Sequence, residues 1–383
     1  MAAPPAYAEI PSSERQALIS LYESTNGAEW TNSSNWNDPV GTECTWYGVV
    51  CDDAQTHVIA IALGKGLFGK TNNMRGTLPD TLAALAELIR VDVSANQISG
   101  ELPSLMTITH LQSFLVSENL FSGPLPSLAG LGELQVFDAS NNNLSGPIPE
   151  LASLRALQVF DVTNNAVRGP LPELSGLGEL QLFAASNNLL SGPIPALTHL
   201  PNLMSFNVSH NHLSGPIPSL AGLDSLVSMD VWSNQLSGPL PSFQTALNLH
   251  AFDAHDNQLT GPIPPLGGLT VFRVGDNHLN GSLPSLVATG HLSLFYNVEN
   301  NKLTGPIPAL DGLDSLFEFR VGGNELSGTA PTHVPPFLIG AVLCPNVLEH
   351  TPDSAWNAAT GVVPWYRDCI ALPDFLFADG FEF

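Results

Sequence analysis

A 23-residue pattern recurs along most of this 383-residue chain and limits its fold more than any other feature. The unit reads Leu-x-x-Phe-x-Val-Ser-x-Asn-x-Leu-Ser-Gly-Pro-Ile-Pro-x-Leu-x-x-Leu, and a degenerate first copy spans residues 58–79, so we expect about twelve units. A fixed period of roughly 20–50 residues is typical of a solenoid, in which each unit buries its apolar face against its neighbours. The asparagine of the pattern stands at Asn96, Asn119, Asn142, Asn165, Asn188, Asn211, Asn234, Asn257, Asn277, Asn301 and Asn324.

Each column of the repeat predicts a structural role. Apolar residues two apart, five and three residues before the asparagine, predict a short strand with one buried face. The strands must be parallel, because each unit travels once around the coil before the next begins. The phenylalanines of the first column should therefore stack inside, and each asparagine side chain should bond backbone groups of its own and adjacent turns. The Gly-Pro-x-Pro run favours an extended or 3₁₀-like return path.

The unit resembles the plant-type extracellular leucine-rich repeat, as in the run 142–149, Asn-Asn-Leu-Ser-Gly-Pro-Ile-Pro. The leader, with Thr-Asn-Gly-Ala-Glu-Trp at 25–30 and Cys-Thr-Trp-Tyr-Gly-Val-Val-Cys at 44–51, is similar to the N-terminal cap of that family. The resemblance implies an α/β leucine-rich repeat solenoid, a curved right-handed coil with a parallel sheet on its concave face. Family members include receptor ectodomains and polygalacturonase-inhibiting proteins, and their shared activity is binding. No kinase segment, membrane helix or linker follows the repeats in this sequence.

The cysteines mark the two ends of the repeat array. Cys44 with Cys51, and Cys344 with Cys369, predict two disulfides and an oxidising compartment, since no closely spaced pair suits a metal site. We expect an N-terminal cap at 1–57, the solenoid at 58–330, a C-terminal cap at 331–370 and a tail at 371–383. The tail resembles a short C-terminal motif of exported proteins in some Gram-negative bacteria, which favours a secreted bacterial member; a hydrophobic tail packed on the cap is the alternative.

Composition narrows the partners. Lys and Arg total 11 against 35 acidic residues, for a net charge of −24, so the chain would repel nucleic acid and anionic membranes. No apolar run approaches the roughly 18–20 residues of a membrane helix. The start, Met-Ala-Ala-Pro-Pro-Ala-Tyr, lacks the basic and apolar regions of a signal peptide. Either a signal peptide was removed and Met1 was added, or export uses another route, and we favour the first.

One motif points to a cofactor that we do not expect. Residues 64–71, Gly-Lys-Gly-Leu-Phe-Gly-Lys-Thr, satisfy a phosphate-loop pattern. That loop needs a helix starting at Lys70, and Gly76 and Pro79 leave no room for one. Other enzyme motifs are missing, and the histidines between 210 and 255 are not expected to converge on a metal. We predict no cofactor, no metal and no catalysis.

The candidate ligand-binding residues lie on the concave face. An outward column between the two buried ones holds five aspartates, and Asp138 with Asp161, and Asp230 with Asp253, would be like charges on adjacent strands. The next outward column is mostly Ser until Trp232 and His255 break it. A large ring on a face of small residues could pack against a side chain of a partner protein or against a sugar. The alternative is that the aspartates are simply solvated on the surface of a very acidic protein and bind nothing. The predicted site is Asp138, Asp161, Asp230, Trp232, Asp253, His255 and Arg273.

These features predict a secreted, non-catalytic binding protein. The first hypothesis is recognition of a secreted or surface protein through the concave face, including inhibition of a wall-degrading enzyme, as the resemblance implies. The alternative is polysaccharide or cell-surface binding, including adhesion, because a face rich in Ser and Asn with one exposed Trp suits sugars equally well. An enzyme would need a titratable group with a shifted pKa in a cleft, and the face of a solenoid rarely offers one, so we do not expect catalysis. The sequence leaves the oligomeric state open.

Overall fold

The structure, a computed structural model, describes residues 9–65, 71–286 and 295–369. The chain divides into two compact units, residues 1–211 and 212–383, which are described separately. Both are β-solenoids of parallel strands with few helices, which confirms the predicted fold class. Most turns contribute a first strand, before the repeated asparagine, and a second strand, directly after it. Each unit therefore has two sheets, which we call the first-strand sheet and the second-strand sheet.

In unit 1 the strands of the first-strand sheet follow one another in chain order, and all its pairs are parallel except the antiparallel start β1–β2. Parallel pairing in equal register brings equivalent residues of successive turns side by side, so each column becomes a row across the sheet. The strands are β1 Val49–Cys51, β2 Val58–Ala62, β4 Arg90–Asp92, β6 Ser113–Leu115, β8 Val136–Asp138, β10 Val159–Asp161, β12 Leu182–Ala184 and β14 Ser205–Asn207.

Unit 2 repeats this arrangement, with parallel pairs throughout its first-strand sheet. The strands are β16 Ser228–Asp230, β18 Ala251–Asp253, β20 Val271–Arg273, β22 Phe295–Asn297, β24 Glu318–Arg320 and β26 Gly340–Val342.

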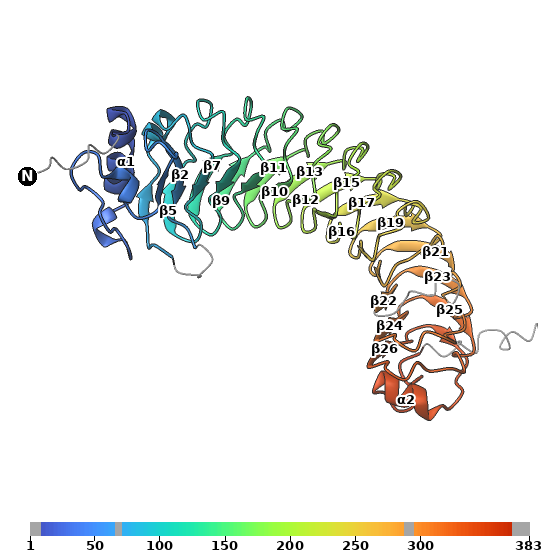
Figure 1. Cartoon of the computed structure of the whole chain (residues 1–383). Coiled ribbons are helices and arrows are strands. Elements are labelled where there is room, and N and C mark those ends of the chain that lie inside the picture. The colour runs from blue at the N-terminus through green and yellow to red at the C-terminus, as the bar shows by residue number, and fades with distance from the viewer. Residues whose placement is uncertain (1–8, 66–70, 287–294, 370–383) are drawn as a thin grey trace, which may run out of the picture. The chain divides into compact units, whose positions relative to one another are not determined.

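The second-strand sheets are also parallel and in chain order. Unit 1 supplies β3 Arg75–Thr77, β5 Gln97–Gly100, β7 Leu120–Pro124, β9 Asn143–Gly146, β11 Ala166–Gly169 and β13 Leu189–Gly192. Unit 2 supplies β15 His212–Gly215, β17 Gln235–Gly238, β19 Gln258–Gly261, β21 His278–Ser282, β23 Lys302–Gly305, β25 Glu325–Gly328 and β27 Val347–Leu348. Figure 1 labels strands of both sheets in each unit, such as β10 and β11 in unit 1 and β24 and β25 in unit 2.

The core of each unit is built from one aromatic column and the leucines of the repeat. In unit 1 the rings of Phe114, Phe137, Phe160, Phe183 and Phe206 stack in sequence with centroids 5.4–5.8 Å apart. In unit 2 Phe252, Phe272, Tyr296 and Phe319 stack in the same way, 5.7–6.2 Å apart. All nine rings are buried, so the column forms a continuous apolar spine within each unit.

Most of the repeated asparagines are buried where the backbone leaves the first strand. Asn142 is representative: its Nδ2 donates to the carbonyls of Val116, Ala139 and Ser140 at 3.0–3.2 Å, and its Oδ1 accepts from Phe121 N–H at 3.0 Å. One side chain thus satisfies backbone groups of its own turn and of the preceding one. The ladder continues to Asn346, which donates to backbone carbonyls in the same way.

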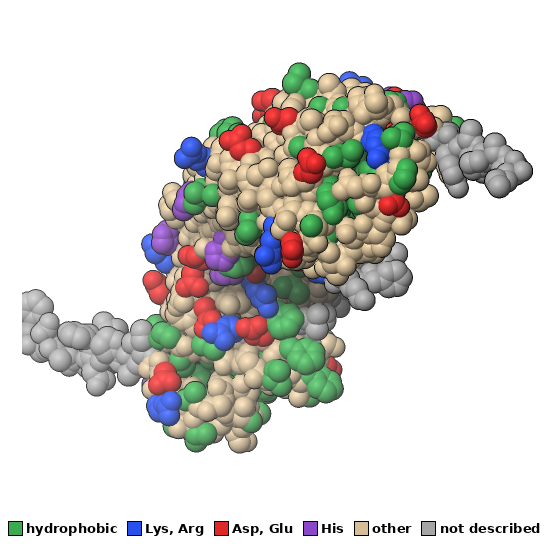
Figure 2. Space-filling model, turned by 90° about the vertical axis from the view of Figure 1, so that its left-hand side faces the viewer, with side chains coloured by type: hydrophobic (Ala, Val, Ile, Leu, Met, Phe, Trp, Pro, Cys, Tyr) green, Lys and Arg blue, Asp and Glu red, His purple; other side chains and the backbone are tan. Residues whose placement is uncertain are grey.

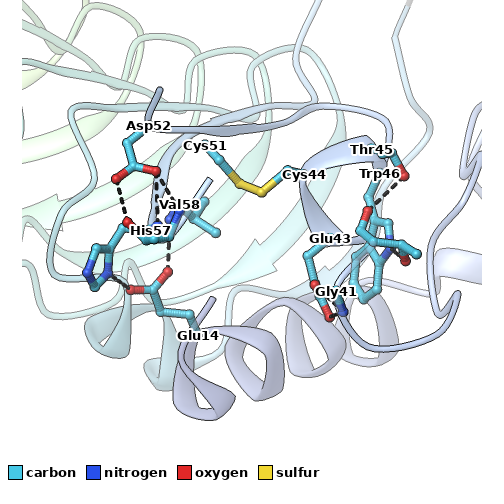
Figure 3. The surroundings of a disulfide bond; sticks show 12 residues. Glu14, Gly41, Glu43, Cys44, Thr45, Trp46, Cys51, Asp52, His57 and Val58 are labelled. Carbon is cyan, nitrogen blue, oxygen red and sulfur yellow. Dashed lines mark hydrogen bonds and ion pairs between the residues drawn. A yellow bond between two sulfur atoms is a disulfide. The ribbon is translucent and has the colours of Figure 1, made fainter. Parts of the chain in front are cut away.

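An N-terminal cap precedes the first turns (Figure 3). It contains helix α1 Ser12–Ser24 and the 3₁₀ turns η1 Gly27–Glu29 and η2 Glu43–Thr45, and a further turn, η3 Asp80–Ala84, follows β3. Cys44 is bonded to Cys51. The buried carboxylate of Glu14 on α1 accepts from Val58 N–H at 2.8 Å and lies 2.7 Å from His57 Nδ1. This contact ties the helix to β2, and the hydrogen bond with Glu14 raises the pKa of His57.

At the other end, β26 and β27 extend both sheets by one turn inside the segment 331–370, and helix α2 Ser354–Thr360 follows them. Asp353 caps α2 by accepting from the N–H groups of Ala355 and Trp356. Cys344 is bonded to Cys369, which links the segment after α2 to the turn that contains β26. The tail 371–383 lies outside the described residues, as do residues 66–70 of the phosphate-loop pattern; Arg75–Thr77 beyond that pattern form strand β3.

Candidate binding site

The outward acidic column has a local structural role that sequence reasoning missed. In six turns the side-chain oxygen of this column accepts from the backbone N–H two residues on, an Asx turn that ends the strand. The pairs are Asp92 with Ser94, Asp138 with Ser140, Asp161 with Thr163, Asn207 with Ser209, Asp253 with His255 and Asn297 with Glu299, at 2.8–3.3 Å. Asn207 and Asn297 make the same contact as the aspartates. The hydrogen bond therefore explains why the position holds Asp or Asn, and it does not require a negative charge.

The predicted pairs of like charges lie side by side. In unit 1 Asp138 on β8 is opposite Asp161 on β10, and in unit 2 Asp230 on β16 is opposite Asp253 on β18. Burial raises the pKa of Asp161, and the charge of Asp138 adds to that effect. Burial likewise raises the pKa of Asp230, with Asp253 contributing. These carboxylates carry an electrostatic cost that a cation bound on the same face would relieve.

In unit 2, four of the predicted residues are brought into contact on the first-strand sheet. The rings of Trp232 and His255 are stacked with centroids 4.7 Å apart. His255 Nδ1 lies 2.6 Å from Asp253 Oδ1, and Arg273 Nη1 lies 3.8 Å from Asp253 Oδ2. The hydrogen bond with Asp253 raises the pKa of His255. Both rings are partly exposed, so the cluster presents a stacked aromatic surface edged by charges.

The charged cluster continues onto two strands, β22 and β24, that the predicted site did not include. Arg273 spans β22, with its guanidinium carbon 4.9 Å from the centroid of the Phe295 ring, and reaches Glu318 on β24 at 3.8 Å. Glu318 also lies 3.6 Å from Arg320, which pairs with Glu299. Figure 2 shows acidic and basic side chains interleaved on the surface. The sequence could have indicated this extension of the site, because Glu318 and Phe295 stand where most other repeats have a small or aliphatic residue.

The remaining predicted residues fall into two groups, one in each unit. Asp138 and Asp161 belong to unit 1 and contact each other through their strands. Asp230 belongs to the same unit as the cluster and accepts from the hydroxyl of Ser228 at 2.8 Å. Among the described residues no group of three or more His, Cys, Asp or Glu side chains is arranged to hold a metal ion. Within the same ranges, every helix is too short or too polar to cross a membrane.

Comparison with known proteins agrees with the sequence resemblance. Residues 11–52 match the leucine rich repeat N-terminal domain, and residues 133–154 and 202–223 match the Leucine Rich Repeat family. A relative, Receptor-like protein 3 of Arabidopsis thaliana, is 35% identical over 95 residues, which cover 24% of this chain and 11% of the relative.

Two solved structures are similar over most of the chain. The ectodomain of the plant membrane receptor kinase GASSHO1/SCHENGEN3 from Arabidopsis thaliana, in complex with CASPARIAN STRIP INTEGRITY FACTOR 2, is 27% identical with a TM-score of 0.77, covering 91% of this chain and 46% of that one. The Arabidopsis receptor kinase HAESA, in complex with the peptide hormone IDA and the co-receptor SERK1, is 26% identical with a TM-score of 0.61, covering 88% of this chain and 66% of that one. This chain thus spans about half to two thirds of those proteins.

Fold, repeat and cap together define the class. The chain is a leucine-rich repeat solenoid with a disulfide-bonded N-terminal cap. Its repeat and cap are similar to those of plant-type extracellular leucine-rich repeat proteins, as the sequence predicted. The two solved structures described above are those of plant receptor kinases in complex with their ligands.

Proposed function

We propose that the protein is a secreted binding module, without catalytic activity, that recognises a segment of another protein on the first-strand sheet of unit 2. The observation that carries the proposal is the stacked pair of Trp232 and His255, bordered by Asp253, Arg273 and the adjacent Asp230. Tryptophan, tyrosine and arginine side chains that become buried on binding supply much of the energy of protein interfaces. The peptide hormone in the HAESA complex supports a polypeptide ligand for a protein of this fold.

Charge supports a partner that carries cations. The chain has a net charge of −24, and the pKa of Asp230 is raised by burial and by the charge of Asp253. A basic partner would be attracted at long range and would relieve this repulsion on contact. Two disulfides at the ends of the array support function in an oxidising compartment, outside the cell or at its surface.

The test is affinity capture from a secretome and from a cell-wall extract. The wild-type protein is compared with the variant Trp232→Ala/Asp230→Asn/Asp253→Asn, in which asparagine at position 253 retains a side-chain oxygen that can accept from the N–H of His255. The double variant Asp138→Asn/Asp161→Asn in unit 1 is the matched control, because it also removes two negative charges from equivalent positions of the same column.

A protein retained by the wild type and by the control, and lost by the site variant, supports the proposal. If the retained protein is a wall-degrading enzyme, an activity assay of that enzyme with added wild-type protein tests inhibition. Polysaccharide retained in place of protein, and competed by free sugar, would select the alternative function. Equal retention by all three proteins would place recognition away from Trp232.

A further inference from the structure

A shallow groove of about 290 Å³ lies on the first-strand sheet of unit 2, apart from the Trp232 and His255 stack. It is lined by Phe295, Phe317, Glu318, Ile339 and Gly340. Phe295, Glu318 and Gly340 are neighbours in register on β22, β24 and β26, and Phe317 and Ile339 come directly before the last two strands. Gly340 has no side chain, so the row stays open at this point. The groove is therefore apolar on its walls and has one carboxylate.

The fold does not require these apolar side chains. The position of Phe317 and Ile339 is filled by glutamine in four successive turns of unit 1, at Gln112, Gln135, Gln158 and Gln181. The backbone hydrogen bonds at this position are the same in both cases: Ile339 N–H donates to Phe317 O at 3.0 Å, as Gln135 N–H donates to Gln112 O at 2.8 Å. Yet Phe317 is 38% exposed and Ile339 is 81% exposed. Adjacent exposed apolar side chains that the fold does not need are typical of an interaction surface, because burying them in a complex is favourable.

The carboxylate of Glu318 remains available to a partner. Its ion pairs with Arg273 and Arg320, at 3.8 and 3.6 Å, are longer than hydrogen bonds, and both arginines are shared with other carboxylates, those of Asp253 and Glu299. Glu318 therefore keeps lone pairs that can accept from a cationic donor. Together with Asp230, these acidic groups outnumber the two arginines, so the surface beside the groove is net negative.

We propose that this groove seats one large apolar side chain of a partner polypeptide, and that a lysine or arginine close to it in the partner's sequence pairs with Glu318. The proposal rests on the proposed binding function and names the chemistry of the bound segment. Charge argues against two other occupants. Residues 371–383 of this chain contain Asp374, Asp379 and Glu382 and no lysine or arginine, and a second copy of the chain carries the same net charge of −24.

The experiment pans a phage-displayed library of random dodecapeptides against the full chain and then measures the Kd of the enriched peptides by fluorescence anisotropy. The blocking variant is Gly340→Leu. A Cβ at this glycine would meet only Glu318 Cγ at 3.8 Å and Phe317 O at 4.0 Å, which are ordinary contacts, so the backbone tolerates a side chain that fills the groove. Ser113→Leu, at the same register position on β6 of unit 1, is the matched control.

We expect enriched peptides to combine a large apolar residue with lysine or arginine. Their Kd should rise roughly 10- to 100-fold with Gly340→Leu, as expected for losing the burial of one apolar side chain, and should be unchanged with Ser113→Leu. Ile339→Ser, a change at a largely exposed side chain, should weaken the same peptides even if Gly340→Leu perturbs the last turn. Glu318→Gln should weaken peptides that carry the cation and spare those in which it is replaced by glutamine.

Several outcomes would overturn the proposal: no enrichment of any peptide, enrichment of acidic peptides, or equal Kd values for wild type and the Gly340→Leu and Ile339→Ser variants. Peptides that bind these variants normally but are lost with Trp232→Ala would overturn the groove while leaving the proposed function in place. Peptides lost with Gly340→Leu but kept with Trp232→Ala would support the groove and move the recognition site away from Trp232.

Discussion

Replacing one ladder asparagine with alanine tests whether this column holds successive turns together. In the Asn142→Ala variant four hydrogen bonds are lost, but the consequences for their partners differ. Each carbonyl keeps a second donor: Val116 O still accepts from Asn119, Ala139 O from Asn165, and Ser140 O from the backbone of Glu118. The N–H of Phe121, which donated to Asn142 Oδ1, loses that acceptor in a buried environment.

The expected cost follows from this inventory. A buried donor left without a partner costs about 1–3 kcal/mol, and each hydrogen bond to a carbonyl that keeps another donor adds about 0.5 kcal/mol, the low end of the usual range. The Asn142→Ala variant should therefore be about 3 kcal/mol less stable than the wild type. Asn142→Asp keeps the acceptor for Phe121, loses the donors, and places a charge against three carbonyls, so it should be at least as destabilising at neutral pH.

The assay is denaturant unfolding, supported by hydrogen exchange at the Phe121 amide, which reports the local opening that a repeat protein allows. The neighbouring residue provides the matched control. Asn143 is exposed on β9, and Asn143→Ala should change stability by less than about 0.5 kcal/mol. Equal stability of the two variants, or unchanged exchange at Phe121, would refute the role assigned to the ladder.

Three further predictions concern the spine, the cap and the acidic column. Phe160→Ala, within the buried ring stack, should cost about 3–5 kcal/mol in denaturant unfolding, and a loss below about 1 kcal/mol would contradict a continuous spine. The Glu14 contact raises the pKa of His57 above 6.5, so its stabilisation is complete below that pH and is lost as the pH rises through the higher value. Glu14→Gln should lower the His57 pKa in an NMR titration and flatten this part of the stability profile. Because the pKa of Asp161 is raised, its ionisation destabilises the fold, and Asp161→Asn should give a small gain at pH 7 that disappears below about pH 3.8; a gain independent of pH would refute the cause.

Much of the fold could be predicted from the sequence because the determinants are local and repeated. The columns that predicted a parallel strand, an internal aromatic stack and an asparagine ladder do form those structures, as the Phe137 and Phe160 stacking shows. Departures occur where the pattern fades. The last turn, with β26 and Asn346, lies beyond the clear repeat, and its leucine-rich rhythm is too weak to indicate another strand. Tertiary stacking on the preceding turn supplies the order that the local sequence does not.

The candidate site was only partly predictable, for a different reason. Equal register in a parallel sheet let the sequence predict that Asp230 would be opposite Asp253, and that Trp232 and His255 would be neighbours. Side chains that cross an intervening strand do not follow from register. Arg273 reaches Glu318 over the ring of Phe295, and this depends on the length and direction of its side chain in three dimensions.

The sequence by itself determined the solenoid, since one 23-residue pattern fixes which residue of every turn is buried and which is exposed. It also determined the net charge of −24, on which the proposal of a cationic partner rests. Only the tertiary structure decided what the outward residues do. It showed that most of the acidic column ends strands through Asx turns. It also showed that Phe317, Ile339 and Gly340 line one groove. The sequence could not show this, because the groove depends on contacts between residues that are distant in the chain and adjacent in space.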